Sequence, residues 1–329
     1  MQFSKNWLND FIDIDLSTED ICAQLTMAGL EVDGFENINS KITGKDSIIK
    51  LDITPNRGDC FSVLGVAREL AVINNLKLRL PEISSVEDSF KDHVRVKVCP
   101  EGPSYYGRTL KNLSLDSKTD PLIAERLRLS DQKLIDPVVD ITNYILLELG
   151  QPLHAFDRDK LKGNISVRTA KNKEKIVLLD DQTLELDSSC LVIADDNGAV
   201  AFAGIMGGKE SAVSTSTKSI FLESAYFKPS AIRGKARRFG FQTDASLRFE
   251  RGVDYKIQEL ALERASMLLR KTLGGEFSSV TSSSLKKYFP KHQPIKLDLE
   301  RSNKILGTNI TKQSAIQYLK GLGFSPDAS

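Results

Sequence analysis

The stretch ITNYILLELGQPLHAFD, residues 141–157, decides the fold class because it contains a change of pattern. An apolar run with helical spacing ends at Gly150–Pro152, and His154 then stands in an expected loop before Phe156. Strand-like and helical patterns interleave irregularly on both sides of this stretch. We therefore predict an α+β fold with several domains, and not a doubly wound parallel sheet.

Local patterns place the expected elements along the chain. Ser17 begins a helix that Gly29 ends, and a second helix is expected to begin at Asp59. Apolar residues with helical spacing predict further helices at residues 121–129 and 256–273. Short apolar runs predict strands, and an Asn-Gly pair predicts a hairpin turn. These strands are 94–98, 165–169, 175–180 and 190–194, and the turn is Asn197–Gly198.

Charge and cysteine content exclude several classes of protein. The 329-residue chain has 45 basic and 44 acidic residues, so its formal net charge is +1 and nucleic acid could be held only by local patches. The four cysteines are far apart, which is typical of reduced, packed thiols and not of a disulfide framework or a zinc site. We see no signal peptide and no membrane span, and we expect a cytoplasmic protein.

Polar, aperiodic segments at residues 81–91 and 282–294 are expected to be linkers. After the second linker, NITKQSAIQYLKGLGFSP (309–326) weakly repeats DLSTEDICAQLTMAGLEV (15–32). Two related modules around a central domain would explain this similarity, and chance similarity between two capped amphipathic helices explains it equally well. We expect that the chain stops at Ser329 by truncation, where a strand could begin.

The sequence lacks the motifs of a P-loop, a zinc hydrolase and a nucleophile-elbow hydrolase. Of the three histidines, His93 and His292 have surroundings typical of a solvated surface. His154 leaves two interpretations open. A histidine between a hydrophobic helix and Phe156 is more often a buried, hydrogen-bonded residue. An imidazole near its unperturbed pKa of roughly 6.5 could also orient a nucleotide hydroxyl or phosphate, or handle a water molecule.

Two further segments permit both a structural and a functional interpretation. AFAGIMGGKES (201–211) concentrates Gly204, Gly207 and Gly208, and forms either a tight turn or a loop whose amides approach a ligand. IFLESAYF (220–227) places Glu223 within an apolar, strand-like run. Because an isolated buried carboxylate is costly, Glu223 either points outward or accepts a hydrogen bond within a pocket.

The segment 233–254 is basic and contains interleaved phenylalanines. Arg237, Arg238 and Arg248 are candidate contacts to an RNA backbone whose unstacked bases would meet the aromatic rings. A solvated basic face explains the pattern equally well. The short polar run Thr243–Ser246 is expected to form the edge of a pocket.

Six segments occur in an order that is specific to one family. They are FSKNWLNDFI (3–12), MAGLEVD (27–33), ITPNRGDCFSVLGVAREL (53–70), VVDITNYILLELGQPLHAFD (138–157), AGIMGG (203–208) and GFQTDASLRFERGVD (240–254). Together they resemble the β subunits of bacterial phenylalanyl-tRNA synthetases over nearly the whole chain. The resemblance implies a central mixed α/β editing domain flanked by small helical, winged-helix-like modules.

The resemblance also implies domain boundaries. These are an α+β module at 1–85 without the family's inserted tRNA-binding barrel, a linker and entry strand at 86–103, the editing domain at 104–281, a linker at 282–293 and the start of a winged-helix-like module at 294–329. Residues 35–52 stand where the barrel would be. Weak affinity for free tRNA is therefore expected.

The family's editing domain hydrolyses tyrosine wrongly attached to phenylalanine tRNA, and the resemblance assigns roles to six residues. Since an apolar pocket barely rejects a ligand that only adds a hydroxyl, the editing site must recognise the phenol directly. Glu223 has the right chemistry to accept its hydrogen bond, and His154 is expected to contact the terminal adenosine. The family's catalytic positions correspond to His154, Glu223, Thr243 and Ala245 in this chain. The family's substrate-binding positions correspond to Asn143 and Gly207.

The resemblance further implies partners and cofactors. The expected partners are the α subunit, in an α2β2 assembly, and tRNA(Phe); DNA and membranes are not expected. ATP and magnesium are expected only in the whole enzyme, in which the α subunit attaches phenylalanine, and no metal site is expected in this chain. The alternative is a non-catalytic scaffold for tRNA and the α subunit. A free-standing DNA- or RNA-binding protein is a weaker third hypothesis.

Overall fold

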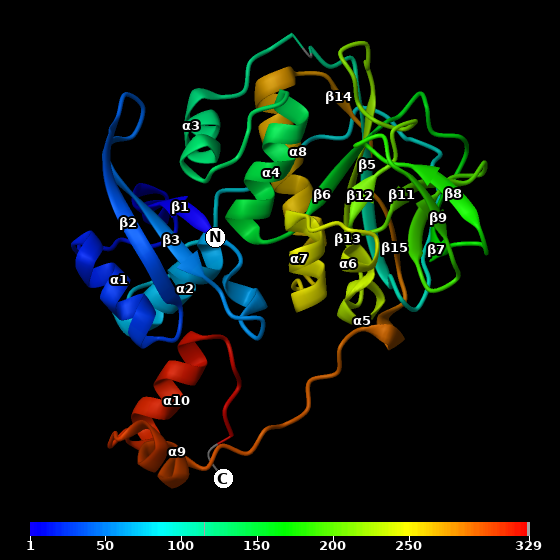
Figure 1. Cartoon of the computed structure of the whole chain (residues 1–329). Coiled ribbons are helices and arrows are strands. Elements are labelled where there is room, and N and C mark those ends of the chain that lie inside the picture. Colours follow the sequence, from blue (N-terminus) through cyan, green and yellow to red (C-terminus); the bar gives the residue numbers. More distant parts are fainter. Residues whose placement is uncertain (115, 328–329) are drawn as a thin grey trace.

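The structure, a computed structural model, describes residues 1–114 and 116–327 and has three parts (Figure 1). An N-terminal unit lies beside a larger central domain, and two short C-terminal helices follow at the end of an extended segment. Helices and strands are mixed in the first two parts, which confirms the predicted α+β class. Among the described residues, no helix is long and apolar enough to cross a bilayer.

The N-terminal unit packs its helices on an antiparallel sheet of order β1-β3-β2. Its apolar side chains form one core with the helices of the central domain. Trp7 is fully buried in this core and stacks on Tyr144 of the central domain, with 4.7 Å between the ring centres. The elements are β1 (Gln2–Ser4), η1 (Lys5–Asp10), α1 (Thr18–Met27), β2 (Glu31–Ser40), β3 (Gly44–Asp52), η2 (Gly58–Cys60) and α2 (Val63–Ile73).

The prediction that the second helix begins at Asp59 is wrong. Helix α2 begins after Ser62, whose Oγ accepts a hydrogen bond from the Gly65 amide at 3.0 Å. Residues 58–60 form the 3-10 turn η2 instead. The Asp59 carboxylate accepts from Arg57 Nη2 at 3.0 Å, so it is engaged by a side chain and does not cap a helix.

Local patterns do not predict the hairpin β2–β3. Its strands pair antiparallel along their length, with one irregularity between Val32 and Gly34. Strand β3 buries Ile49 and Leu51 in the core, whereas β2 is polar and largely solvated. The strand signal in β2 is weak because strand propensity depends on the partner surface, which lies elsewhere in the chain.

Three layers build the central domain. Helices α4 and α8 cover one face of a sheet of order β14-β5-β13-β6, and β15 also pairs with β5. A second sheet, β12-β11-β10-β7-β4, packs on the other face (Figure 1). Helix α3 packs on α4, and the hairpin β8–β9 packs on β11.

The helices and strands of this domain interleave irregularly, and most of the strand pairs are antiparallel, as in an α+β fold. Its helices are α3 (Pro121–Leu129), α4 (Pro137–Leu149), α5 (Pro229–Ile232), α6 (Lys235–Arg238), α7 (Asp244–Arg251) and α8 (Gln258–Leu273). Its strands are β4 (Val96–Lys97), β5 (Ser104–Lys111), β6 (Leu153–Asp157), β7 (Ile165–Thr169), β8 (Glu174–Val177), β9 (Thr183–Leu186), β10 (Leu191–Ala194), β11 (Ala199–Phe202), β12 (Met206–Gly207), β13 (Ile220–Tyr226), β14 (Glu276–Phe277) and β15 (Thr281–Ser284).

Strand β13 is buried on both faces, which explains its nearly continuous apolar run. Ile220 and Leu222 pack in the core on the helical side, while Phe221 and Ala225 pack in the core between the two sheets. Side chains alternate along a strand, so Glu223 shares the face of Phe221 and Ala225. Glu223 therefore points into the layer between the sheets.

Most predicted elements of the central domain are present, some with different ends. The helix at 121–129 and the strand at 165–169 have the predicted bounds, and the loop with Asn197–Gly198 joins antiparallel β10 and β11. Strand β4 covers only two residues of the predicted 94–98. Strand β8 ends at Val177, because Leu178 turns away to bridge Gly208.

The structure places both predicted linkers against the central domain. In the first, the Ser89 amide donates to the Phe277 carbonyl at 2.7 Å, and Asp88 pairs with Arg108 at 3.2 Å. In the second, residues 281–284 form β15. The linker assignment is therefore wrong for residues 282–284, where a run of serines conceals a strand that β5 stabilises.

The C-terminal helices α9 (Leu299–Leu306) and α10 (Lys312–Gly321) include the second copy of the weak repeat. Thr311 caps α10 as Ser17 caps α1, each accepting from the amide three residues on. The glycines after the two helices have φ values of 86° at Gly29 and 88° at Gly323. Only glycine adopts this conformation readily, so the repeated sequence encodes the same two helix ends.

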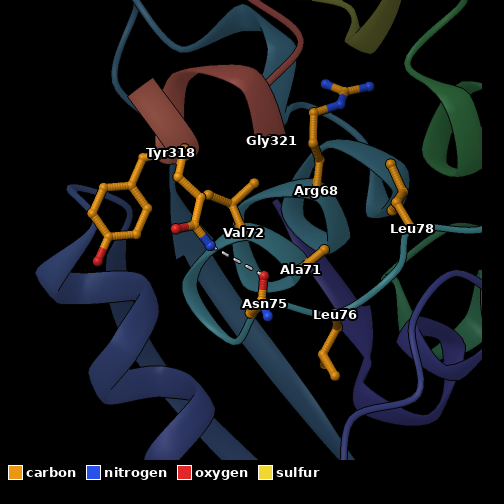
Figure 2. A pocket seen from close by; sticks show the side chains of 9 residues that line it. Arg68, Ala71, Val72, Asn75, Leu76, Leu78, Tyr318 and Gly321 are labelled. Carbon is orange, nitrogen blue, oxygen red and sulfur yellow. Dashed lines mark hydrogen bonds between the residues drawn. The ribbon is translucent and has the colours of Figure 1, made fainter. Parts of the chain in front are cut away.

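A cleft lies between α2 and α10 (Figure 2). Across it, Gln317 Nε2 donates to Asn75 Oδ1 at 3.4 Å. Gly321 lies so close to α2 that a Cβ there would be 2.8 Å from a methyl group of Val72. None of the predicted site residues lines this cleft, whose walls are Arg68, Ala71, Val72, Asn75, Leu76, Leu78, Gln317, Tyr318 and Gly321.

Candidate functional site

Two of the predicted site residues are neighbours across adjacent strands. Glu223 on β13 and His154 on β6 are direct antiparallel partners, so their side chains lie on one face of the sheet. The partner of Glu223 on the other side is Gly107 of β5, which has no side chain. His154 therefore lies within a strand, and the prediction of a loop at this position is wrong.

The Glu223 carboxyl group lies in a nearly dry environment. Its residue is 7% exposed, and Oε2 is buried without a hydrogen-bond partner among the described residues. Burial raises the pKa of this carboxyl from 4.5 to about 7, and the Tyr105 hydroxyl opposes the increase. Of the two interpretations of Glu223, the inward one is observed. An acceptor without a donor in the free protein is the arrangement expected where a ligand supplies the donor.

The His154 ring presents its polar edge to the same layer. Its Nε2 is buried and has no partner among the described residues, and the ring meets Phe156 edge to face at 4.5 Å between centres. Burial lowers the pKa of His154 to about 4, so the imidazole is neutral at neutral pH. The residue as a whole is only half-buried. A ligand could therefore reach the ring, which offers one donor and one acceptor.

Gly207 on β12 lies directly against the His154 ring. A Cβ at Gly207 would be 2.4 Å from Cε1 and 2.6 Å from Nε2 of His154. Here space, and not a positive φ, demands glycine, whereas Gly204 has a φ of 69° and forms the turn before β12. The turn interpretation of the glycine-rich segment is therefore confirmed at Gly204, and the approach of its amides to a ligand stays a prediction.

Thr243 and Ala245 lie at the first turn of α7. Thr243 is the helix cap: its Oγ1 accepts from the Ser246 amide at 3.0 Å. The same hydroxyl donates to the Ile205 carbonyl at 3.0 Å, next to β12 and Gly207. Ala245 follows on the helix and is half-buried. The structure thus joins the cap of α7 to the strand that faces His154.

Asn143 lies on α4, the helix that leads through Gly150 into β6. It is half-buried, and no hydrogen bond joins its side chain to His154 or Glu223 among the described residues. Helix α4 packs on the face of the sheet opposite to the Glu223 side chain. Asn143 is therefore near the site in the chain, but the structure gives it no contact with the polar pair.

The three candidate arginines have different surroundings. Arg237 is exposed, and Arg238 pairs with Asp187 at 2.6 Å while its guanidinium lies over the Phe239 ring. Arg248 is 2% exposed and donates to the Phe61 carbonyl at 3.1 Å. A tRNA backbone cannot reach a buried guanidinium in this conformation. Arg248 therefore has a structural role, which corrects its prediction as a tRNA contact.

Tyr105 is a residue of this site that the sequence analysis did not identify. It lies on β5, is fully buried, and its hydroxyl has no partner that meets hydrogen-bond geometry among the described residues. Its ring lies nearly parallel to Phe221, at 6.5 Å between centres. The sequence SYYGRTLK (104–111) is typical of a strand and could have indicated β5. Nothing in it indicates that this strand pairs with β13.

A cluster of Asp59, Cys60 and Glu69 has ligand atoms close enough to hold a cation. Arg57 already serves as the cation in the structure: Nη2 lies 3.0 Å from Asp59, 3.0 Å from Cys60 Sγ and 2.6 Å from Glu69. Burial raises the pKa of the Cys60 thiol above its usual range. The cluster is thus an internal ion pair that stabilises the turn before α2.

Residues 101–274 match the model of the B3/4 domain family. This chain belongs to the B3/4 domain family. The matched residues comprise β5, β13 and β6 of the central sheet, the second sheet from β7 onward, and the helices α3–α8. Glu223, His154, Gly207 and Thr243 therefore all lie within the B3/4 domain.

Curated relatives extend the similarity to the N-terminal unit. The chain is 49% identical over 281 residues to the phenylalanine–tRNA ligase beta subunit of Idiomarina loihiensis, which is 85% of this chain and 35% of that protein. It is 46% identical over 288 residues to the protein of the same name from Acinetobacter baylyi, which is 87% of this chain and 36% of that protein. The chain thus spans about a third of the length of these relatives.

A solved structure shows a more distant similarity. An N-terminal fragment of the phenylalanyl-tRNA synthetase beta-subunit from Pyrococcus horikoshii has a TM-score of 0.41 and 18% identity, and the match covers 98% of this chain and 88% of that chain. This likeness is too low to inform the chemistry of the site. The B3/4 assignment rests on the family match.

Proposed function

We propose that the B3/4 domain of this chain hydrolyses tyrosine esters of phenylalanine tRNA, as the editing site of a phenylalanine–tRNA ligase. One observation carries the proposal: a buried carboxylate, Glu223, has an oxygen without a donor and stands beside neutral His154 between two apolar layers. The similarity to phenylalanine–tRNA ligase beta subunits supports the placement of this domain in such an enzyme.

Selection for tyrosine follows from the chemistry of Glu223. Tyrosine and phenylalanine differ by one hydroxyl, and only the phenol donates a hydrogen bond to the carboxylate. A phenylalanine side chain in the same place would leave the carboxylate dry and unpaired. Sites built to bond a substrate hydroxyl reject the analogue without it by up to about 10⁴ to 10⁵. Glu223 is therefore the residue that selects the substrate.

Hydrolysis itself is assigned to a water molecule. No serine or cysteine donates to a histidine in the described part of the chain, so the structure offers no paired protein nucleophile. Water adds to the ester carbonyl, the bond to the ribose oxygen breaks, and that oxygen takes the proton that water loses. His154, neutral at neutral pH, orients the terminal adenosine or the water through Nε2.

The other site residues shape the pocket in this proposal. Gly207 leaves room beside His154, and Thr243 and Ala245 border the amino acid from the first turn of α7. Asn143 is a substrate contact only if the substrate spans from the strand β6 to α4. Arg237 is the exposed candidate for a tRNA contact, with Arg238 beside it.

The whole enzyme is proposed to contain an α subunit and to bind tRNA(Phe), with ATP and magnesium serving the α subunit. The competing function is a scaffold that positions tRNA and the α subunit without chemistry of its own. A scaffold does not require a carboxylate that destabilises the free protein. The unpartnered Glu223 oxygen therefore favours hydrolysis.

A deacylation assay with the purified chain tests the proposal. The substrates are tyrosine and phenylalanine esters of a short RNA that mimics the 3′ end of tRNA, at concentrations high enough to offset weak binding. Selective loss of the tyrosine ester, greatly reduced in His154→Ala, is the expected result. Equal stability of both esters with and without the protein would leave the scaffold as the better account.

A further inference from the structure

Tyr105 stands behind the Glu223 carboxyl group, on the strand next to β13. On β5 the residue directly opposite Glu223 is Gly107, and Tyr105 lies two residues away on the same face. The Phe221 ring packs over Gly107. Tyr105 and Glu223 are diagonal neighbours across the two strands, close enough for an aromatic and a long side chain to meet. Both groups are buried in the layer between the sheets, and both carry an oxygen without a partner of good geometry among the described residues.

Glu223 is 7% exposed, and its Oε2 is buried without a hydrogen-bond partner among the described residues. The Tyr105 ring is held between β5 and Phe221, with 6.5 Å between ring centres. A ring packed in this way cannot swing out with the substrate. Its hydroxyl is therefore a fixed feature of the inner side of the site.

Few ionisable side chains share this face. Tyr105 from β5 and His154 from β6 flank Glu223, while β12 contributes only Met206 and Gly207. Beyond β12, the Lys209 ammonium pairs with Asp181 on the surface. At the cap of α7, Asp244 pairs with Arg248 at 2.8 Å. Among the described residues, Tyr105 and His154 are thus the side chains placed to donate a hydrogen bond to Glu223, and Tyr105 is the fully buried one.

We infer that Tyr105 is a positioning residue that determines specificity: its hydroxyl donates to Glu223 and favours the ionised form of that carboxyl group, so that the other oxygen can accept a substrate phenol. The inference rests on the proposed editing function and names a part of its machinery. A carboxylate that accepts one fixed hydrogen bond is favoured over the protonated acid. It also presents a charged acceptor, whose bond to a phenol is stronger than that of a neutral acid.

The ionisation of the two groups fits this role. Burial raises the pKa of Glu223 to about 7, and the Tyr105 hydroxyl opposes that increase. Burial and the neighbouring carboxylate raise the pKa of Tyr105 well above 10, so the phenol keeps its proton throughout the working range. Loss of this donor would favour the protonated form of Glu223, which is a weaker acceptor for the phenol of tyrosine.

Tyr105→Phe removes the hydroxyl and keeps the ring that packs on Phe221. NMR of the chain with ¹³C-labelled glutamate carboxyl groups reports the titration of Glu223 directly. The Glu223 signal is the one that disappears in Glu223→Gln. We expect its midpoint to rise by about one pH unit in Tyr105→Phe, and hydrolysis of the tyrosine ester at pH 7 to fall about fivefold. Activity should recover above pH 8, while the slow reaction of the phenylalanine ester should not change.

Tyr106→Phe is the matched control, because Tyr106 is the next residue on β5 and its half-buried side chain packs toward the helices. It should leave the Glu223 titration unchanged. An unchanged Glu223 midpoint in Tyr105→Phe would overturn the inference, whether or not the wild-type chain hydrolyses esters. A different outcome is a wild-type chain that hydrolyses neither ester, together with a shifted Glu223 midpoint in Tyr105→Phe. That outcome would contradict the proposed function and would still establish the coupling of the two residues.

Discussion

Glu223 and His154 are polar residues in apolar strands, and each has a buried polar atom without a partner in the described structure. Such atoms lower the stability of the free protein, because the hydrogen bonds to water lost on folding are not replaced. A ligand that supplies the missing partners would recover this free energy. At the scale of the residue, the unpartnered atoms that would recognise a ligand therefore lower the stability of the free protein, and this cost can be measured.

Glu223→Gln should stabilise the folded chain at pH 8. The pKa of Glu223 in the folded chain is about 7, above its ordinary 4.5, so the folded state binds the proton more tightly than the unfolded state. The penalty of the buried charge is therefore fully present above pH 7 and vanishes below pH 4.5. We expect Glu223→Gln to gain about 2 kcal/mol in the free energy of unfolding at pH 8 and little at pH 5, in urea titrations.

Glu185→Gln is the control for this experiment, because Glu185 lies in a strand with its side chain exposed. Its effect should be within about 0.5 kcal/mol at both pH values. If the difference in the free energy of unfolding between Glu223→Gln and the wild type were the same at pH 5 and at pH 8, the Glu223 carboxyl group would be solvated.

The apolar run around Glu223 indicates that this carboxylate is unusual. It does not indicate the face of the sheet on which the side chain lies. That face depends on which strands pair with β13, and pairing between distant segments has no local signature. His154 was predicted as a site residue, but its place in a strand opposite Glu223 was not. Tyr105 could not be identified because its role depends on the pairing of β5 with β13, which no local pattern indicates.

At the scale of the element, helix α7 joins the site to its surroundings through its cap. Thr243 accepts from the Ser246 amide and donates to the Ile205 carbonyl, so one hydroxyl fixes both the helix start and the segment before Gly207. Loss of this hydroxyl should loosen both. The capping residues of α1 and α10 make no comparable bond to a neighbouring element among the described residues.

Thr243→Ala should cost about 1 to 2 kcal/mol of stability, because it removes a cap and leaves a carbonyl without its donor. Hydrogen exchange should accelerate at the amides of α7 and at residues 205–208. Thr311→Ala, at the exposed cap of α10, should leave exchange in the B3/4 domain unchanged. Unaltered exchange near Gly207 in Thr243→Ala would contradict the proposed link.

Elements with strong local signals were predictable, and those that depend on a partner were not. Helices α1 and α3 begin at capping residues and carry apolar faces, so their sequences suffice to place them. Strands β2 and β15 are polar and exist because β3 and β5 supply hydrogen bonds. The start of α2 was misplaced because Arg57 binds the Asp59 carboxylate that could otherwise have capped a helix.

At the scale of the whole molecule, α7 also fastens the B3/4 domain to the N-terminal unit. Arg248 Nε donates to the Phe61 carbonyl at 3.1 Å, and Arg251 Nη1 donates to the Ile53 carbonyl at 2.6 Å. Both guanidinium groups lie over the Phe61 ring. Basic residues that resembled an RNA-binding surface in the sequence thus include two that hold the parts of the molecule together.

Arg248→Met should destabilise the chain by about 2 to 3 kcal/mol, because the Phe61 carbonyl loses a buried charged donor. The measurement is the urea midpoint, compared with Arg237→Met, whose exposed side chain should contribute less than about 0.5 kcal/mol. If the two variants were equally stable, Arg248 would not be a structural tie between the two parts.

The α+β class was predictable from the irregular alternation of patterns, but the layers were not. Nothing local indicates that β13 lies between β5 and β6, or that a second sheet covers the face with Glu223. The family resemblance supplied the site residues that the patterns could not select. The structure adds the reason why they act together, since strand pairing brings His154 and Glu223 side by side.

The central claim is that the Glu223 carboxylate recognises a phenol, and one measurement tests it most directly. Hydrolysis rates of tyrosine and phenylalanine esters of the short RNA mimic are compared at pH 8 for the wild type and for Glu223→Gln. The account predicts a strong preference for tyrosine in the wild type that falls at least about tenfold in Glu223→Gln, because a neutral amide is a weaker acceptor than a carboxylate. An unchanged ratio of the two rates would contradict it.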